Sequence, residues 1–246
     1  MRNIKIIIEY DGKNFAGWQI QPGKASIQGE MQRALKDVTG EDIEIIASGR
    51  TDAGVHAYGQ TANFKTNSKV PIQKIPYALN AKLPKDISVI SCEEVDMDFH
   101  ARYNACGKTY RYLIYNKPYR SPLYKNLAYH VKYDLDWDKI RLEAKYLIGT
   151  HDFVGFMSSG SSVKDTVRTI YDIKIEEHEG ITSIEISGNG FLYNMVRIIV
   201  GVLIRVGRRY YPPEKVLALL EGRERTGEAV TAPPQGLCLM EIQYGK

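Results

Sequence analysis

The stretch SIQGEMQRALKDVTG, residues 26–40, determines the first helix of the predicted fold. Ser26 has a side chain favoured at a helix N-cap, the apolar residues that follow recur at helical spacing, and Gly40 is a typical helix stop. It comes after IKIIIEYD at residues 4–11, an apolar run that is typical of a strand. These segments therefore predict a β-strand followed by an amphipathic helix.

The remaining elements repeat one order. The first half continues with predicted strands at 43–47 and 58–64, a short helix opened by Pro71, and a strand at 87–95. The second half has predicted strands at 109–116, 167–175, 182–187 and 237–244, and helices at 136–149, 191–206 and 213–220. Apart from the short helix at 213–220, each half reads β-α-β-β-α-β, which is the order of a ferredoxin-like or RRM-like unit. We therefore predict an α+β protein with one half at residues 1–105 and another at 106–246. If the two sheets abut, the natural cleft lies between the halves.

The composition is that of an ordinary globular protein. The chain has 246 residues, with 33 Lys and Arg against 29 Asp and Glu, which gives a net charge of +4. This mild excess permits a polyanionic partner without requiring one. The three cysteines fit no disulfide or zinc pattern, and the longest apolar run, 191–206, is interrupted by Arg197 and Arg205. We expect a cytoplasmic protein without a signal peptide or membrane span.

A loop between two predicted strands carries the first candidate site. Residues 48–57 read SGRTDAGVHA and contain Arg50, Asp52 and His56 among glycines. The loop is longer than a hairpin needs, and such ordered loops often hold functional groups. The alternative is a surface loop whose Asp forms an Asx turn, and spacing alone does not choose between the two. A lone loop histidine such as His56 is more often a structural hydrogen-bonding residue.

Two further segments could contribute chemistry. Residues 99–112 interleave aromatic and basic side chains, which suits base stacking and phosphate contact, although packing inside a sheet is the simpler explanation for Tyr112. For Tyr110 the spacing does not decide. Arg197 lies in the apolar run near its start, so we expect it to be buried with an anionic partner, the alternative being an arginine that extends to solvent. Arg205, Arg208 and Arg209 could complement a helix dipole or touch phosphates.

Several site classes have no support in the sequence. There is no phosphate-binding GxxxxGK[ST] loop, and the pattern at 188–190 lacks the rest of a dinucleotide fingerprint. No group of His, Cys and Asp has convincing metal spacing, and Asp52 with His56 would be a poor metal site. We therefore expect neither a cofactor nor a metal.

Short segments along nearly the whole chain resemble the motifs of the tRNA pseudouridine synthase A family. The chain departs from the family pattern at Gly155, where the family more often has Ser or Ala. The segment that resembles the family's catalytic motif is GRTDAGVH at 49–56. The other matching segments are FAGWQ (15–19), NAKLP (80–84), FHAR (99–102), KTYRY (108–112), HDF (151–153), RTI (168–170), MVR (195–197) and TAPPQGL (231–237).

The resemblance implies a fold and a function. Family members isomerise uridine to pseudouridine in the anticodon arm of tRNA, at nucleotide positions 38 to 40. They need no cofactor or metal and work as homodimers. Their two α/β halves surround a shared, mainly antiparallel sheet with a central catalytic cleft. The same fold and function are expected of this chain.

The resemblance also implies roles for single residues. Asp52 is the expected catalytic carboxylate, Arg197 its partner, and Tyr110 the ring that stacks on uracil and helps to remove the C5 proton. Arg50 is expected to assist flipping of the nucleotide, and Leu237 to pack on the other face of the base. His56 and Arg102 are lesser substrate-binding candidates.

Two other functions could use similar features. A non-catalytic RNA-binding protein could present strand aromatics on two RRM-like halves, but would need no carboxylate beside an arginine. A metal-dependent hydrolase could use Asp52 and His56. The full set of motifs disfavours both.

Overall fold

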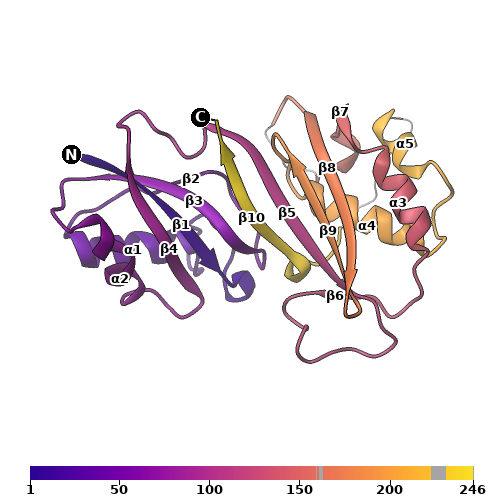
Figure 1. Cartoon of the computed structure of the whole chain (residues 1–246), viewed down its shortest axis with the longest axis horizontal. Helices are drawn as coiled ribbons and strands as arrows, with labels where there is room; N and C mark the ends of the chain where they lie inside the picture. The colour runs from indigo at the N-terminus through magenta and orange to yellow at the C-terminus, as the bar shows by residue number, and fades with distance from the viewer. Residues whose placement is uncertain (159, 161–162, 223–230, 246) are drawn as a thin grey trace. The chain divides into compact units, whose positions relative to one another are not determined.

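We describe a computed structural model of the chain, covering residues 1–158, 160, 163–222 and 231–245. The chain divides into two compact units. One contains Met1–Cys106 together with the chain from Cys238 onward, and the other contains Gly107–Leu237. Each is a sheet of mainly antiparallel strands with helices, so the predicted α+β class is confirmed (Figure 1).

The first unit has the sheet order β4-β1-β3-β10, with β2 added to β3. Strand β1 pairs antiparallel with both β3 and β4, and β3 pairs parallel with β10. Its elements are β1 (Arg2–Tyr10), η1 (Gly12–Asn14), α1 (Ile27–Thr39), β2 (Ile46–Ala47), β3 (His56–Thr66), η2 (Ile72–Lys74), α2 (Ile75–Asn80), β4 (Ile87–Val95) and β10 (Leu237–Tyr244).

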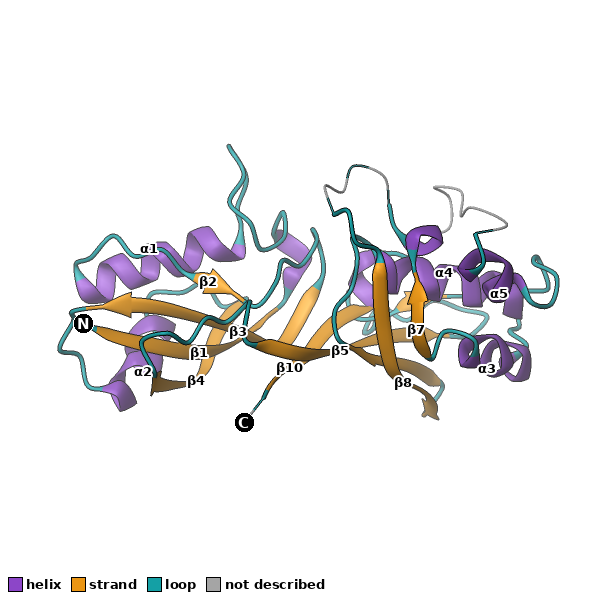
Figure 2. Cartoon of the chain, turned by 90° about the horizontal axis from the view of Figure 1, so that it is seen from above, coloured by secondary structure: helices purple, strands orange, loops and turns teal. Residues whose placement is uncertain are grey.

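The core of this unit follows from the apolar pattern of β1 and α1. Alternate strand residues Ile4, Ile6 and Ile8 are fully buried, as their period of two requires. Helix α1 begins as predicted, because the Ser26 side chain accepts a hydrogen bond from the Gly29 N–H. The helix lies along the sheet and buries Ile27, Met31, Ala34 and Leu35 (Figure 2).

The second unit has the sheet order β5-β9-β8-β7, all antiparallel, and β6 pairs parallel with β5. Its elements are β5 (Ala105–Tyr115), β6 (Tyr129–His130), α3 (Trp137–Lys145), β7 (Gly149–Asp152), η3 (Val154–Phe156), β8 (Val167–His178), β9 (Ile181–Gly188), α4 (Met195–Gly207), α5 (Lys215–Leu220) and η5 (Pro234–Gly236).

Helix α4 is the centre of the second core. Eleven of its thirteen residues are buried; the exceptions are Arg197 and Arg205. A Cβ added to Gly207 would lie 2.5 Å from the Ile140 side chain, so α3 and α4 approach closely there. At Gly155, where the family more often has Ser or Ala, a Cβ would lie 2.8 Å from the Leu219 carbonyl oxygen, so η3 and α5 also approach closely. Among the described residues, no helix is both long and apolar enough to cross a membrane.

The structure differs from the prediction in element bounds. The strand predicted at 43–47 is only Ile46–Ala47, although Ile43 and Ile45 are buried. The apolar pattern at 43–45 therefore reflects burial of these side chains and not the hydrogen bonding of a β-strand. The helix predicted from residue 191 begins at Met195, because Asn194 has φ +60°, a left-handed conformation outside the helix.

The structure also differs in strands and in the division of the chain. Strands β6 and β7 were not predicted; both are short. The prediction placed the C-terminal strand in the second half, but Cys238 and Leu239 pair with β3, and the contacts group this part of the chain with the first unit. Sequence order alone does not reveal such a return to an earlier sheet.

Candidate active site

The loop between β2 and β3 that carries Asp52 is fastened through Thr51. The Thr51 hydroxyl and the Tyr10 hydroxyl are 2.8 Å apart and buried, and the Thr51 carbonyl accepts the Trp18 N–H at 3.0 Å. Thr51 is 6% exposed, whereas Arg50 is exposed and Asp52 partly exposed. The chain thus anchors one residue and presents its two neighbours toward the surface.

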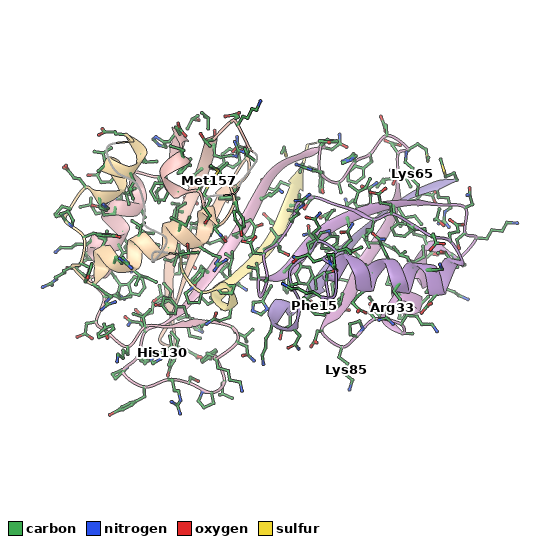
Figure 3. The ribbon with its side chains drawn as sticks, turned by 180° about the vertical axis from the view of Figure 1, so that it is seen from behind. Phe15, Arg33, Lys65, Lys85, His130 and Met157 are labelled. Atoms are coloured by element: carbon green, nitrogen blue, oxygen red, sulfur yellow. The ribbon has the colours of Figure 1, made fainter. Side chains whose placement is uncertain are left out.

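Two glycines allow a neighbouring segment to lie directly against this loop. Gly17 has φ +94°, and a Cβ there would lie 2.5 Å from the Thr51 carbonyl oxygen and 3.0 Å from the Asp52 carbonyl carbon. A Cβ at Gly12 would lie 1.9 Å from the Val55 carbonyl oxygen. Phe15, labelled in Figure 3, accepts the Gly54 N–H through its carbonyl at 3.3 Å. The FAGWQ segment therefore packs directly against the backbone of the Asp52 loop.

Buried polar groups hold the other end of the loop. Ser48 donates to the Gln60 side-chain oxygen at 2.7 Å, and the Gln60 amide donates to the Gly49 carbonyl at 3.0 Å. The Val55 N–H closes a turn onto the Asp52 carbonyl at 3.1 Å. Burial raises the pKa of the Tyr10 hydroxyl, which keeps this anchor neutral. The loop is consequently braced at both ends, and Asp52 begins the turn that it contains.

His56 faces inward from the start of β3. It is 6% exposed, and its Nδ1 accepts the Gly12 N–H at 3.1 Å while lying 3.1 Å from an Asp11 carboxylate oxygen. The neutral imidazole would accept from Gly12, and the protonated ring would donate to Asp11. Either state connects η1 to β3, which favours the structural role for His56.

Arg102 lies on a separate exposed turn of the first unit. Its guanidinium is 5.9 Å from the centre of the Tyr103 ring, which stacks on His100 at 4.2 Å. The adjoining Ala101 is fully buried, and its N–H donates to the Asn63 side chain at 2.9 Å. The buried Ala101 therefore fixes a turn that presents aromatic and basic side chains at the surface. The sequence predicted this mixture of side chains, but not the hydrogen bond between Ala101 and Asn63.

In the second unit, Tyr110 and Tyr112 have different environments on β5. The Tyr110 ring is partly exposed and meets Phe191 edge to face at 5.3 Å. Tyr112 is fully buried and donates to the Pro233 carbonyl at 2.7 Å, so the packing role expected for it is confirmed. Burial also raises the pKa of Tyr112. Tyr110 thus keeps a ring face at the surface of its unit, supported by a second aromatic residue.

Arg197 is held in one orientation by neutral acceptors. Its Nε donates to the Ala232 carbonyl at 2.8 Å, and its Nη1 donates to the Asn194 side chain at 2.7 Å. Ala232 in turn donates its N–H to the Arg197 carbonyl at 3.0 Å. Arg197 is half-buried, rather than buried as predicted.

Leu237 follows a segment packed against Tyr112. A Cβ at Gly236 would lie 2.6 Å from the Tyr112 ring, so only glycine allows this approach. Leu237 itself is 5% exposed. The Arg197 and Tyr112 hydrogen bonds to Ala232 and Pro233 therefore also set where the C-terminal strand begins.

The structure gathers the candidate residues into two groups. In the first unit, Arg50 and Asp52 share one loop, His56 begins β3, and Arg102 lies on another turn. In the second unit, Arg197 is hydrogen-bonded to the segment 231–237, which ends at Leu237, and Tyr110 lies on β5 against Phe191. The pairing of Asp52 with Arg197, which would join the two groups, stays a prediction.

Several supporting residues were not predicted from the sequence. These are Thr51 with Tyr10, Gln60, Phe191, Asn194 and the carbonyl of Ala232. The glycines within the matching motifs were the available signal, since a required glycine often marks a close backbone approach. The sequence does not state which segment makes that approach.

Comparison with known proteins agrees with these motifs. A family model described as tRNA pseudouridine synthase matches residues 6–104 and 144–245. The chain is 50% identical to the tRNA pseudouridine synthase A of Thermoanaerobacter sp. (strain X514) over 244 residues, covering 99% of this chain and 100% of that one. It is 51% identical to the protein of the same name from Acetivibrio thermocellus, again over 244 residues with 99% and 100% covered.

Among solved structures, an archaeal box H/ACA sRNP Nop10–Cbf5 complex aligns with a TM-score of 0.39 and 14% identity, covering 96% of this chain and 45% of that one. The sequence relatives are far more similar and extend over the full length of both chains. Together with the family match, which includes the Asp52 loop and α4, they show that the chain belongs to the tRNA pseudouridine synthases, a family of isomerases.

Proposed function

We propose that this enzyme converts uridine to pseudouridine in the anticodon arm of tRNA, at nucleotide positions 38 to 40. The observation that carries the proposal is the placement of Asp52. A partly exposed carboxylate lies on a loop fastened through Thr51, Gln60 and the close approach of Gly17. Such support suits a group that must meet a reacting atom in one geometry.

The reaction leaves the atomic composition of the nucleotide unchanged and moves one bond. The bond between C1′ and N1 breaks, the uracil turns, and a bond forms between C5 and C1′. N1 gains a proton, and C5 loses one. A stacked loop hides these atoms, so the target uridine must be flipped out of the stack. Asp52 can attack C1′ as a nucleophile, or remove the 2′ proton to give a glycal.

The second unit supplies the other assigned roles. Tyr110 stacks on the uracil with its partly exposed ring and carries a hydroxyl that can accept or pass on the C5 proton. Arg197, whose orientation is set by Asn194 and Ala232, pairs with Asp52 and keeps that carboxylate ionised. Arg50 is exposed beside Asp52, where it can assist flipping of the nucleotide.

The remaining assignments are less central. Leu237 packs against the base, Arg102 contacts the RNA, and His56 maintains the loop from within. The enzyme acts as a cytoplasmic homodimer without metal or cofactor. A non-catalytic RNA-binding protein is the alternative, and it would need no carboxylate on a braced loop.

The deciding experiment compares Asp52→Asn with the parent enzyme. The amide keeps the size of the side chain but removes its charge and its nucleophilic oxygen. We expect release of tritium from C5-labelled uridine in tRNA to be abolished while tRNA binding persists. Asp42→Asn is the matched control, because Asp42 is an exposed carboxylate of the same unit, paired with Lys36.

A folded Asp52→Asn enzyme that binds tRNA and releases tritium at the parent rate would refute the assignment. Mass spectrometry must exclude deamidation back to Asp. Pseudouridine mapping of the product tests the positions separately, since conversion only outside positions 38 to 40 would reject the anticodon-arm assignment and leave the chemistry intact.

A further inference from the structure

The positive charge of the chain is concentrated in one part of its sequence. The whole chain has a net charge of +4, but the run between Asp98 and Asp134 contains no Asp or Glu. The basic residues of this run are Arg102, Lys108, Arg111, Lys117, Arg120, Lys125 and Lys132. Much of it forms the long loop from β5 to β6 and the connection onward to α3 (Figure 1).

The end of this run is fastened next to a second group of basic residues. The Asn116 side chain donates to the Val131 and Tyr133 carbonyls, at 2.8 Å each, which closes the loop. The Asp136 N–H then donates to the Gly207 carbonyl at 2.9 Å, at the C-terminal end of α4. The chain that follows the loop is therefore fixed against the helix end where the predicted basic cluster begins.

At this junction cations lie against aromatic rings. The Arg208 guanidinium is 4.0 Å from the centre of the Tyr133 ring, and the Lys132 ammonium is 5.2 Å from it. One turn earlier, Arg205 lies 5.6 Å from the Tyr210 ring, which is 71% exposed. We call Lys132, Tyr133, Arg205, Arg208 and Tyr210 the α4-end surface.

A purely structural role explains only part of this arrangement. Cations at a helix C-terminus favour the helix dipole, and Arg209 pairs with Asp136 at 3.4 Å. Lys132 and Arg208 are exposed, and no carboxylate among the described residues forms an ion pair with either. Asp134, two residues after Lys132, is also exposed. The two cations Lys132 and Arg208 therefore outnumber this one carboxylate.

We propose that the α4-end surface binds the phosphodiester backbone of the RNA substrate, as a contact additional to the nucleotide that reacts. The inference rests on the proposed function for the identity of that substrate. Stacking on Tyr133 fixes the plane of the Arg208 guanidinium and leaves its N–H edge available for two phosphate oxygens. The exposed rings of Tyr133 and Tyr210 can also stack on unpaired bases. A purely acidic partner would use the cations but would not need these rings.

The test measures tRNA binding by the double variant Lys132→Gln/Arg208→Gln across a range of salt concentrations. Loss of two phosphate contacts should raise Kd at least about tenfold and lower the slope of log Kd against log salt by about 2. Arg208→Lys keeps the charge without the planar stack and should give an intermediate Kd. The control Arg141→Gln/Lys174→Gln removes two exposed cations of the same unit, 46% and 63% exposed, and should bind as the parent does.

An unchanged Kd and salt slope in the double variant would reject the proposal, even if the parent enzyme is fully active. A fall in affinity that matches a loss of self-association in sedimentation would also reject it, and would assign the surface to contacts between copies. If the parent binds tRNA but converts no uridine, while the double variant loses affinity as expected, the proposed function fails and the surface assignment stands.

Discussion

Replacing Gly17 by alanine tests whether the FAGWQ segment positions Asp52. The residue has φ +94°, where a side chain costs about 1–2 kcal/mol. The new Cβ would lie 2.5 Å from the Thr51 carbonyl oxygen, and ordinary contact begins at 3.4 Å, so the loop must retreat by about 0.9 Å (3.4 minus 2.5). Overpacking of this kind adds about 1–3 kcal/mol. We therefore expect a total loss of about 2–5 kcal/mol of stability.

The same displacement should affect catalysis more strongly than folding. A shift near 1 Å in a catalytic group can reduce turnover about 100-fold. We expect Gly17→Ala to remain folded at low temperature, to bind tRNA, and to lose about two orders of magnitude in kcat for tritium release. The measurements are a denaturant melt, a binding titration and single-turnover kinetics on one preparation.

Gly40→Ala provides a matched control. Gly40 also has a positive φ, +76°, but a Cβ there meets nothing within 4 Å. It should lose about 1–2 kcal/mol of stability and keep the parent kcat. If Gly17→Ala retains the parent kcat, or if Gly40→Ala loses turnover equally, the positioning of Asp52 by close backbone contact is wrong.

Three other results are expected. Tyr110→Phe should bind tRNA nearly normally, because the stacking ring is worth about 1–3 kcal/mol per base, but turn over poorly; parent-like single-turnover rates would leave Tyr110 a stacking role alone. Burial raises the pKa of Tyr10, Tyr112 and Tyr244, so the stability they contribute is present below about pH 10, the unfolded value, and is lost as the pH rises above it. Tyrosinate absorbance during alkaline denaturation checks this, since ionisation of all 17 tyrosines before unfolding would contradict it. Turnover should survive exhaustive EDTA treatment; a loss that a divalent ion restores, with the tRNA fold intact, would establish a metal requirement.

Local chemistry made much of the architecture predictable. The Ser26 cap, the helical apolar spacing and Gly40 placed α1 within a residue of its observed bounds, because a helix end is determined by side chains adjacent in sequence. The apolar run at residues 4–11 likewise identified β1 as a strand. The same reasoning failed at 191–194, where the left-handed Asn194 excludes an apolar segment from the helix.

The sequence identified the residue types of the candidate site. It did not identify the residues that hold those side chains in place. Arg197 could be selected because an arginine in an apolar run violates local expectation, whereas spacing left the role of Asp52 open and the family resemblance selected it.

Sequence by itself determined most of the element order and the family, and it supplied the candidate residues for the chemistry. Only the tertiary structure decided that Gly17 lies under the Asp52 loop, that Asn194 and Ala232 orient Arg197, and that the C-terminal strand pairs with β3. The physical reason is the range of the interactions. Helix caps and side-chain periodicity act between residues close in the chain, whereas backbone contacts between distant segments depend on how the whole core packs.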